Sequence, residues 1–442
     1  MIETIKSILS NIKGIDDWKI IEKSTSSREL FFVRQEMDMN RGKDVTNYSV
    51  TVYVDFEENE KKYRGSTTVS IYPTMSVEEI RDNIEEGVFA AGFVKNEYYP
   101  IPEQVNSSLT GFSNGKHMEV ESNFSKGNIS TNLSNLSKVL FKEDKFEKGG
   151  INSSELFLNK INTRIINSKG IDVSFSRYTS MLEVVTDWKE NNEEIEIYRN
   201  IEFTQYDEDF IKNEIKDMLN LSRERAIANP TPDIVDCKIL LTGEPVKEFF
   251  DYSYTNTNAK MVYDGISTCK VGESVQGKNV NGDVISIELD PNWENSTFSV
   301  PYDSDGLLLE SVEIISDGTL LRYWGDFRHS HYLNVEPTGN ISNLVVKEGS
   351  KSVSEMKKVH YMELVSFSDF QMDPLTGDFG GEIRLGWYFD GEVNKPITGG
   401  SISGNIKEVE NEMYFSSEVQ KINNFKGPRT IELHNTSIAG IK

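Results

Sequence analysis

The sequence predicts an α+β fold of two domains, an N-terminal antiparallel sheet with helices and a C-terminal strand-rich domain. Apolar and polar residues alternate in stretches such as "YSVTVYVDF", which is the period of a half-buried strand. Strands follow strands without regular βαβ alternation. A long helical pattern, "DEDFIKNEIKDMLNLSRERAIA", ends at the prolines of "NPTPDIVDC", after which strand patterns dominate. We therefore expect domains at residues 1–230 and 231–442.

Composition limits the kinds of partner. The 442 residues are 37% apolar, enough for a sizeable core, and they carry a formal net charge of −24. This charge repels phosphate backbones and acidic lipid, so nucleic acid and membranes are not expected partners. The sequence contains no apolar run of the roughly 18 residues that span a membrane, and its first residues lack a signal peptide pattern. Cys237 and Cys269 make no disulfide framework, and a cytoplasmic location is expected.

The N-terminal half contains clear strand and helix patterns. Ile2, Ile5 and Ile8 recur at helical spacing, and the runs "WKIIEKS", "ELFFVRQ", "YSVTVYVDF" and "KYRGSTTVSIY" predict strands. Ser76 and Glu79 form a capping box that opens the helix "SVEEIRDNIEEGVFAAGFVKN". Residues 101–131 lack any period, which indicates a surface loop.

Further elements follow in both halves. The patterns "LSNLSKVLFKEDKF" and "SSELFLNKINTR" predict helices, and "GIDVSFSRYT" and "SMLEVVTDWK" predict strands around a turn near Tyr178 and Thr179. "GEPVKEFFDYSYTNTNAK" predicts a helix. In the second half, Asp317-Gly318 and Asp390-Gly391 predict β-hairpins, because this dipeptide suits the left-handed turn between two strands.

The sequence offers few candidates for chemistry. On a strand, His329 and His331 of "RHSHYLN" would share a face and could bind a metal with a third ligand, although an exposed polar strand face is the commoner explanation. "PYDSDGLL" lacks the ligand spacing of a calcium loop and indicates a turn. "LTGDFGGEIRLG" matches no phosphate loop and indicates a strand entry where another backbone passes close. No residue pattern in the sequence indicates a nucleophilic triad.

Several segments occur together in one order: "DIVDCKILLTGEPVKEFFDY", "SVPYDSDGLLLESVEIISDGTLL", "TGNISNLVVKEGS", "MDPLTGDFGGEIRLGWYFDGEVNKPITGGSISGNI" and "GPRTIELHNTSIAG". Together they resemble the TldD/PmbA family, historically called modulators of DNA gyrase and understood as a two-subunit metallopeptidase. The resemblance spans most of the chain and is most specific after Asp233.

In that family the catalytic subunit carries His-Glu-x-x-x-His on a helix, with a later cysteine as third zinc ligand. In the best register, Asp251, Tyr252 and Asn256 stand at these positions. The sequence has no histidine between His117 and His329. Tyr and Asn cannot replace a carboxylate base and a neutral imidazole. The resemblance therefore implies the PmbA, or TldE, subunit, which lacks the metal.

The resemblance implies a metal-free subunit that binds unfolded peptide and assembles with a zinc-bearing TldD-like partner, for proteolysis or peptide maturation in a bacterial cytoplasm. Asp378 and Arg384 are the expected substrate-binding or interface residues. We expect no catalytic residue and no cofactor in this chain, so its own enzymatic status stays undecided. The alternatives are a regulatory protein-binding module of the gyrase-modulator type and an independent hydrolase with a metal site at His329 and His331. The substrate, and whether a homodimer forms without the partner, stay open.

Overall fold

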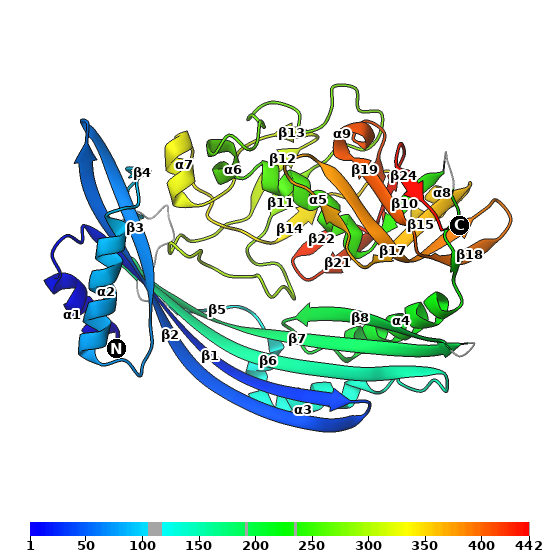
Figure 1. The fold of residues 1–442 in the computed structure, drawn as a ribbon, viewed down its shortest axis with the longest axis horizontal. Helices are drawn as coiled ribbons and strands as arrows, with labels where there is room; N and C mark the ends of the chain where they lie inside the picture. Colours follow the sequence, from blue (N-terminus) through cyan, green and yellow to red (C-terminus); the bar gives the residue numbers. More distant parts are fainter. Residues whose placement is uncertain (105–116, 191–192, 234–236, 442) are drawn as a thin grey trace.

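The computed structural model describes residues 1–104, 117–190, 193–233 and 237–441. Figure 1 shows a long, curved sheet along the lower side of the molecule and a strand-rich C-terminal half above it. Helices and antiparallel strands are not arranged as βαβ units in the N-terminal sheet. The predicted α+β class is confirmed.

The N-terminal sheet, as far as the described residues define it, has the order β4-β3-β2-β1-β6-β7, and β5 and β8 both pair with β7. Neighbours are antiparallel except for β5 and β7, which run parallel. Its strands are β1 (Asp17–Val33), β2 (Glu36–Glu58), β3 (Lys61–Ile71), β4 (Asn96–Glu97), β5 (His117–Glu119), β6 (Gly149–Asn167), β7 (Asp172–Glu190) and β8 (Glu193–Phe203).

Helices cover one face of this sheet at both of its ends. At one end α1 (Ile2–Asn11) and α2 (Val77–Ala91) bury a core that includes Ile20 and Val50 of the sheet. The capping box of Ser76 and Glu79 starts α2 as predicted. At the other end α3 (Ile129–Leu140) and α4 (Glu208–Ala226) pack on Leu156 of β6. The short 3-10 helix η1 (Asn123–Lys126) precedes α3.

The helix predicted at residues 153–164 is wrong, because this segment lies within β6. Leu156 and Leu158 pack with α3 and α4, whereas Ile165 packs on the opposite face in a cluster with Tyr302. Ile166 packs in the core of α1 and α2, so both faces of the strand are buried at this end and the two-residue period is lost.

Two predicted breaks are also wrong. The runs "WKIIEKS" and "ELFFVRQ" belong to one strand, β1. The expected turn near Tyr178 and Thr179 does not form, because β7 continues through both residues and they pair with Lys160 and Asn159 of β6. In both β1 and β7 the residues at the expected break are polar. Such residues are uncommon in the middle of a strand, so the sequence did not indicate that the strand continues.

Two boundaries differ from the sequence-based expectation. The helix expected over residues 133–146 begins earlier, at Ile129, where the Asn128 side chain accepts a hydrogen bond from the Ser130 N–H, and it ends at Leu140. In the expected 101–131 loop, residues 105–116 lie outside the described part, and residues 117–131 form β5, η1 and the start of α3.

The strands of the C-terminal half form two sheets. The larger has the order β20-β23-β10-β15-β17-β18-β9, and β16, β19 and β24 join it through β17 and β19. Its strands are β9 (Asn229–Pro230), β10 (Lys238–Thr242), β15 (Tyr361–Phe367), β16 (Gln371–Met372), β17 (Asp378–Phe389), β18 (Asn394–Thr398), β19 (Ser401–Asn405), β20 (Tyr414–Phe415), β23 (Thr430–Leu433) and β24 (Ser437–Ala439).

The smaller sheet has the order β13-β12-β11-β14-β22-β21. A shared apolar core that includes Phe250 and Ile287 lies between the two sheets and helix α5. The strands of the smaller sheet are β11 (Ile287–Leu289), β12 (Val312–Ser316), β13 (Thr319–Leu320), β14 (Leu344–Val346), β21 (Val419–Ile422) and β22 (Phe425–Pro428), and the helices of this half are α5 (Glu244–Asn256), α6 (Ala259–Tyr263), α7 (Phe327–Leu333), α8 (Val353–Met356) and α9 (Ile406–Val409).

Both predicted hairpins are confirmed. Asp317 and Gly318, with φ of 43° and 77°, join β12 and β13, which pair directly. At Asp390-Gly391, where Gly391 has φ of 100°, β17 turns into β18. A left-handed backbone costs glycine little, which explains its place in these turns.

A turn at residues 301–309 joins the C-terminal half to the N-terminal sheet. Lys19 Nζ of β1 lies 2.5 Å from Asp305 Oδ1. Gly306 adopts φ of +82°, and a Cβ there would lie 2.7 Å from Ile171. The position therefore requires glycine, because a side chain would be both strained and in collision.

Asp303 is buried in this turn with only 4% of its surface exposed. Its Oδ1 accepts the backbone N–H groups of Asp305 and Leu307, and its Oδ2 has no hydrogen-bond partner among the described residues. Burial, reinforced by the neighbouring Asp305 carboxylate, raises the pKa of Asp303 to about 7. The nearby Lys19 ammonium acts in the opposite direction.

None of the described helices is long and apolar enough to cross a membrane. The proposed division at residues 1–230 and 231–442 stays a prediction. The strand pairs of the N-terminal sheet all lie before residue 204, whereas β9 at Asn229–Pro230 pairs with β18.

We expect limited proteolysis to cut first between Ala228 and Asp236 or within residues 101–131, because connecting segments are cut more readily than packed helices and sheets. Mass spectrometry of the early fragments identifies the sites. Early cuts distributed evenly through both halves would contradict the division.

We expect Asp303→Asn to stabilise the protein at pH 8 by up to about 4 kcal/mol and to have little effect at pH 3.5. The folded pKa lies above the unfolded one, so ionisation costs stability as the pH rises from about 4 to about 7. Thermal unfolding across this range measures the effect. Asp317→Asn, at an exposed hairpin turn, is the control, and an Asp303→Asn effect that does not vary with pH would contradict the assignment.

Candidate functional site

Helix α5 carries Asp251, Tyr252 and Asn256, the three positions that the resemblance aligns with the zinc motif. The chain enters the helix through Gly243, which has φ of 85°, and Pro245 occupies its first turn, where a missing N–H costs nothing. Phe249 and Phe250 are buried in the C-terminal core and fix the rotation of the helix. The remaining face meets the turn between β16 and β17.

The side chains at these positions already have partners. Asp251 Oδ2 lies 3.3 Å from Lys247 Nζ, and burial nevertheless raises the pKa of Asp251. A Cβ on Gly377 would lie 3.4 Å from the Tyr252 ring. Asn256 Nδ2 donates to the carbonyl oxygens of Tyr252 and Pro374, at 3.0 and 2.8 Å. Asn256 thus ties the end of α5 to the turn.

These residues do not fit a zinc ion. Zinc requires imidazole, thiolate or carboxylate ligands with free lone pairs, but the Asn256 amide nitrogen donates to two carbonyls and Asp251 is held by an ammonium. Throughout the described ranges, no group of three or more His, Cys, Asp or Glu side chains is arranged to hold a metal. The absence of zinc stays a prediction, because no measurement of metal content tests it.

Asp378 begins β17, next to the same turn. Its Oδ1 accepts a hydrogen bond from Asn405 Nδ2 at 2.7 Å, across the pairing of β17 with β19. Hydrogen bonds from Asn405 and Thr376 lower the pKa of Asp378. The exposed carboxylate is therefore ionised and oriented, and it lies within a polar turn rather than in a closed pocket.

Arg384 lies further along the same strand. Six residues at about 3.3 Å each place it about 20 Å from Asp378. Its guanidinium lies 3.4 Å from Glu382 and close enough to Arg225 of α4 to lower the pKa of that arginine, whose burial is the larger cause. The structure therefore does not bring Asp378 and Arg384 together. One lies beside α5 and the other faces the N-terminal half.

His329 and His331 do not lie on a strand, which corrects the geometry considered from the sequence. Asp326 caps α7, and its carboxylate accepts the His329 N–H and lies 2.8 Å from His329 Nδ1. Side chains two residues apart on a helix point about 200° apart. His329 is buried and His331 is exposed, so the two cannot share one metal ion.

A buried charged cluster in the larger C-terminal sheet was missed by sequence reasoning. Glu432 of β23 and Glu363 of β15 flank Leu240 of β10 on one face. Glu432 lies 2.8 Å from Lys351 Nζ, and Glu363 lies 2.6 Å from Lys357 Nζ. The signal was present in "YMELVSF" and "TIELH", where a glutamate interrupts an otherwise apolar strand.

The cluster holds the Glu432 carboxylate ionised. Burial alone would raise the pKa of Glu432, but hydrogen bonds from His434 and Lys351 and the charge of Lys238 lower it to about 2. With its oxygens held by these partners, Glu432 is fixed in the sheet and is not available as a proton carrier at neutral pH.

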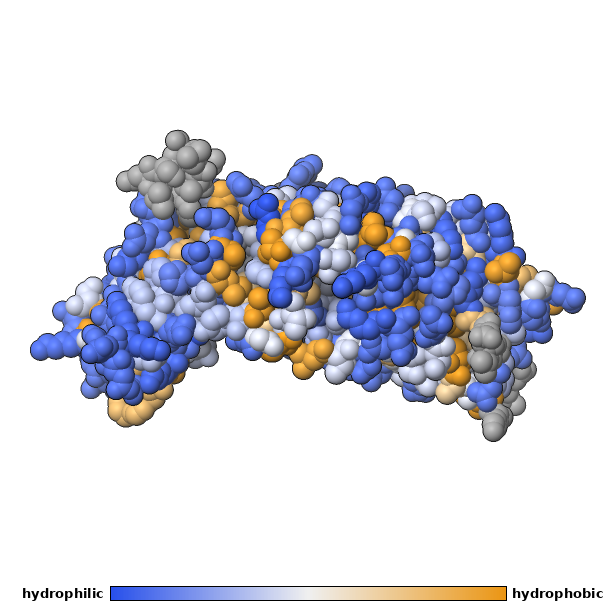
Figure 2. Space-filling view, turned by 90° about the horizontal axis from the view of Figure 1, so that it is seen from above, coloured by the Kyte–Doolittle hydropathy of each residue, from blue (hydrophilic) through white to orange (hydrophobic). Residues whose placement is uncertain are grey.

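On the face that Figure 2 presents, apolar residues are scattered among polar ones. A cavity of about 780 Å³ lies at the far end of the N-terminal sheet. It is lined by the β1–β2 turn, the segment before β6 and the end of β7, including Arg34, Met37, Phe146, Lys148 and Asp187.

Comparison with known proteins assigns the C-terminal half. Residues 235–440 match the family model of the PmbA/TldA metallopeptidase C-terminal domain. This half is therefore a domain of the metallopeptidase type. A relative named metalloprotease PmbA homolog from Buchnera aphidicola is 25% identical over 304 residues, which are 65% of this chain and 66% of that protein. Residues 235–440 therefore belong to the TldD/PmbA family.

Two solved structures share the fold over almost the whole chain. TldE from Thermococcus kodakarensis has a TM-score of 0.77 at 16% identity, and the match covers 99% of this chain and 100% of that one. A candidate modulator of DNA gyrase from Bacteroides thetaiotaomicron has a TM-score of 0.79 at 16% identity, with 99% and 98% covered. These likenesses concern the fold, and the names describe those proteins.

Proposed function

We propose that this chain is a metal-free, PmbA/TldE-like subunit that binds unfolded peptide and assembles with a zinc-bearing TldD-like partner. The proposal rests on helix α5, where Asp251 and Asn256 already have ion-pair and hydrogen-bond partners. The domain is of a metallopeptidase type, yet Asp251 is paired with Lys247 and Asn256 serves as a hydrogen-bond tie to Pro374. With these side chains engaged, the helix has a structural role and supplies no metal ligand.

The chain's own contribution is then positional. An extended peptide can be bound through main-chain hydrogen bonds to sheet edges, and this requires no catalytic side chain. Walls that exclude folded proteins and hold a peptide in place raise the rate of a reaction performed by the partner. We propose that this takes place in the cytoplasm, in a dimer of the two different subunits, for proteolysis or peptide maturation.

The independent hydrolase is the weaker alternative. It needs His329 and His331 to meet one ion, and their opposite directions on α7 argue against that. No described feature favours the regulatory module over the peptidase subunit.

We expect the purified protein to contain less than one-tenth of a zinc ion per chain, because the residues on α5 do not fit the metal. Elemental analysis after purification without chelators makes the measurement. One zinc per chain, lost in a His329→Ala plus His331→Ala variant, would overturn the proposal and favour the hydrolase.

We expect a disordered peptide to be cleaved only when this chain and a zinc-bearing homologue are combined, because one supplies the walls and the other the metal. Size exclusion with light scattering measures the complex, and fluorescence dequenching measures cleavage. Full activity of the zinc chain alone, with no complex, would contradict the proposal.

Variants separate the two candidate residues, which lie too far apart to act as one site. Asp378→Ala and Arg384→Ala are tested singly and together, and Glu392→Ala in an exposed turn is the control. Slow cleavage by an intact complex places a residue at the substrate surface. Loss of the complex places it at the subunit interface, and normal behaviour of all three variants removes both residues from the site.

A further inference from the structure

Two phenylalanines lie in solvent at the C-terminal end of helix α2. Phe89 and Phe93 are 72% and 74% exposed, which is more than any other large apolar side chain of the described residues. Their rings contact each other edge to face, with centroids 4.9 Å apart. Single exposed apolar side chains are normal on a protein surface, but two such phenylalanines in contact form a continuous apolar site. We call them the phenylalanine pair.

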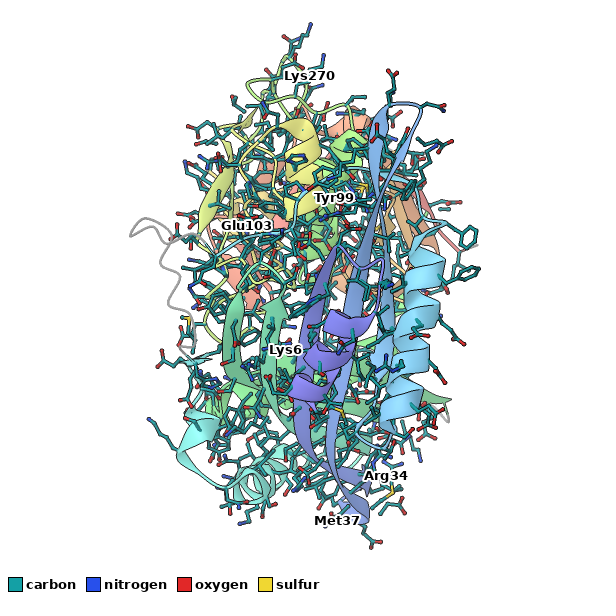
Figure 3. The ribbon with its side chains drawn as sticks, turned by 90° about the vertical axis from the view of Figure 1, so that its left-hand side faces the viewer. Lys6, Arg34, Met37, Tyr99, Glu103 and Lys270 are labelled. Carbon is teal, nitrogen blue, oxygen red and sulfur yellow. The ribbon has the colours of Figure 1, made fainter. Side chains whose placement is uncertain are left out.

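The packing of α2 keeps the phenylalanine pair outside. Ile80, Ile84 and Ala91 face the core between the helix and the sheet, and Phe89 lies on the opposite side of the helix. The last turn of α2 lies so close to β3 that a Cβ on Gly65 would be 1.8 Å from the Ala91 carbonyl oxygen. The helix therefore cannot roll to bury the pair. Figure 3 shows α2, in light blue, at the right margin with its outer side facing away from the sheet.

An acidic stripe extends from the phenylalanine pair along the outer side of α2. It consists of four exposed residues: Glu78, Asp82, Glu85 and Glu86. Neighbours in this stripe are three or four residues apart, so their carboxylates repel one another on the helix surface. None of the four forms an ion pair with another described residue, and the single basic residue of α2, Arg81, is half-buried at the side of the stripe. The stripe is thus negative and uncompensated.

The end of the helix adds to this negative charge. The last carbonyl groups of a helix form the negative end of its dipole, which basic side chains in the last turn commonly offset. The last turn of α2 has no basic residue, and Lys95, which follows it, forms an ion pair with Glu58. A cation from another molecule would therefore reduce a repulsion that this part of the chain leaves unopposed.

Charge separates the occupants that this face could have. A second copy of the chain carries the same acidic stripe and the same net charge of −24, so the two copies repel each other. An anionic membrane surface is disfavoured for the same reason. A polypeptide that combines apolar side chains with flanking lysines or arginines matches both the phenylalanine pair and the acidic stripe.

We propose that the outer face of α2 binds a basic amphipathic helix of a different protein. The apolar stripe of that helix covers Phe89 and Phe93, and its basic side chains pair with the acidic stripe. A helix fits because the phenylalanine pair and the carboxylates recur at a spacing of three or four residues, which is the spacing at which two packed helices interdigitate. Helix α2 lies in the other half from α5, so the proposal holds whether or not a zinc-bearing subunit is found.

The test uses the full chain and two fluorescent peptides of about eighteen residues, a length that allows an amphipathic helix. Both peptides have the same leucine stripe, which is flanked by lysines in the basic peptide and by glutamates in the acidic one. We expect the basic peptide to bind at least about tenfold more tightly by fluorescence anisotropy, because several attractive charge pairs replace repulsive ones. Raising the salt concentration from about 0.05 M to about 0.5 M should reduce this preference several-fold.

One variant removes the apolar part of the surface. Phe89→Ala plus Phe93→Ala should weaken binding of the basic peptide at least about tenfold, because the leucine stripe loses its apolar contact. The thermal midpoint should not change, because both side chains are exposed in the free protein. Tyr198→Ala, on β8 with 60% of the tyrosine exposed, is the control and should leave binding unchanged.

A second variant removes the charge. Asp82→Asn, Glu85→Gln and Glu86→Gln together should abolish most of the preference for the basic peptide, because the acidic stripe is then largely neutral. The matched control makes the same change in net charge at exposed positions of the other half, and it should retain the preference. Its substitutions are Glu310→Gln, Glu313→Gln and Glu348→Gln.

Several outcomes would overturn the proposal. They are no binding of the basic peptide at millimolar concentration, equal binding of both peptides, and binding that the phenylalanine variant leaves unchanged. A wild-type dimer that the phenylalanine variant dissociates would assign the face to a second copy of this chain. Binding to phosphatidylcholine vesicles that is lost in the same variant would assign it to a membrane surface, and either result would also overturn the proposal.

Discussion

The relative position of the two halves depends on the turn at residues 301–309. Its glycine, Gly306, allows the backbone to approach the side chains of Ile165 and Ile171, and Lys19 of the central strand β1 holds the turn through Asp305. β1 pairs along most of its length with both β2 and β6, so a contact with β1 is transmitted to the whole N-terminal sheet. A charge pair and one glycine therefore anchor the C-terminal half to the central strand of the N-terminal sheet.

Other contacts along the same seam are polar and geometrically specific. Asn295, in a left-handed conformation with φ of 65°, accepts the backbone N–H groups of Thr204 and Gln205. At the opposite end, Arg328 of α7 donates to Asn96 and Tyr332 donates to the Glu97 carbonyl. Apolar surfaces alone would allow the halves to slide, whereas these hydrogen bonds select one arrangement. The placement of Arg384 beside Arg225 is a result of that arrangement.

Local signals in the sequence were sufficient for elements whose structure is decided locally. The capping box at Ser76 and the Asp-Gly turn at Asp390 satisfy their own backbone groups, so their outcome does not depend on distant residues. The Asp317-Gly318 turn was predicted from the left-handed preference of its residues alone. β6 is different, because Leu156 is buried by helices and Ile165 by the 301–309 turn on the other face. The order of apolar residues in β6 can be explained only when the helices on one face and the turn on the other are both known.

The candidate site was only partly accessible to sequence reasoning for the same reason. The helix that carries Asp251, Tyr252 and Asn256 was predicted and is confirmed, whereas the match of these residues to the zinc motif stays a prediction. What Asn256 does, however, depends on Pro374, which is 118 residues later in the chain. The separation of Asp378 and Arg384 likewise follows from strand length, which the glycine-rich sequence did not reveal.

The pairing of β10 with β23 has a consequence for synthesis. Leu240 lies opposite Glu432, 192 residues later in the chain (432 − 240), and the Ile441 N–H donates to the Thr231 carbonyl at 2.9 Å. The N-terminal sheet has all its described strands by Phe203. On the ribosome the N-terminal half can therefore fold before β23, the pairing partner of β10, has been synthesised. During that interval the apolar strand β10 is exposed, so the nascent C-terminal half is the part of this protein that needs protection from aggregation.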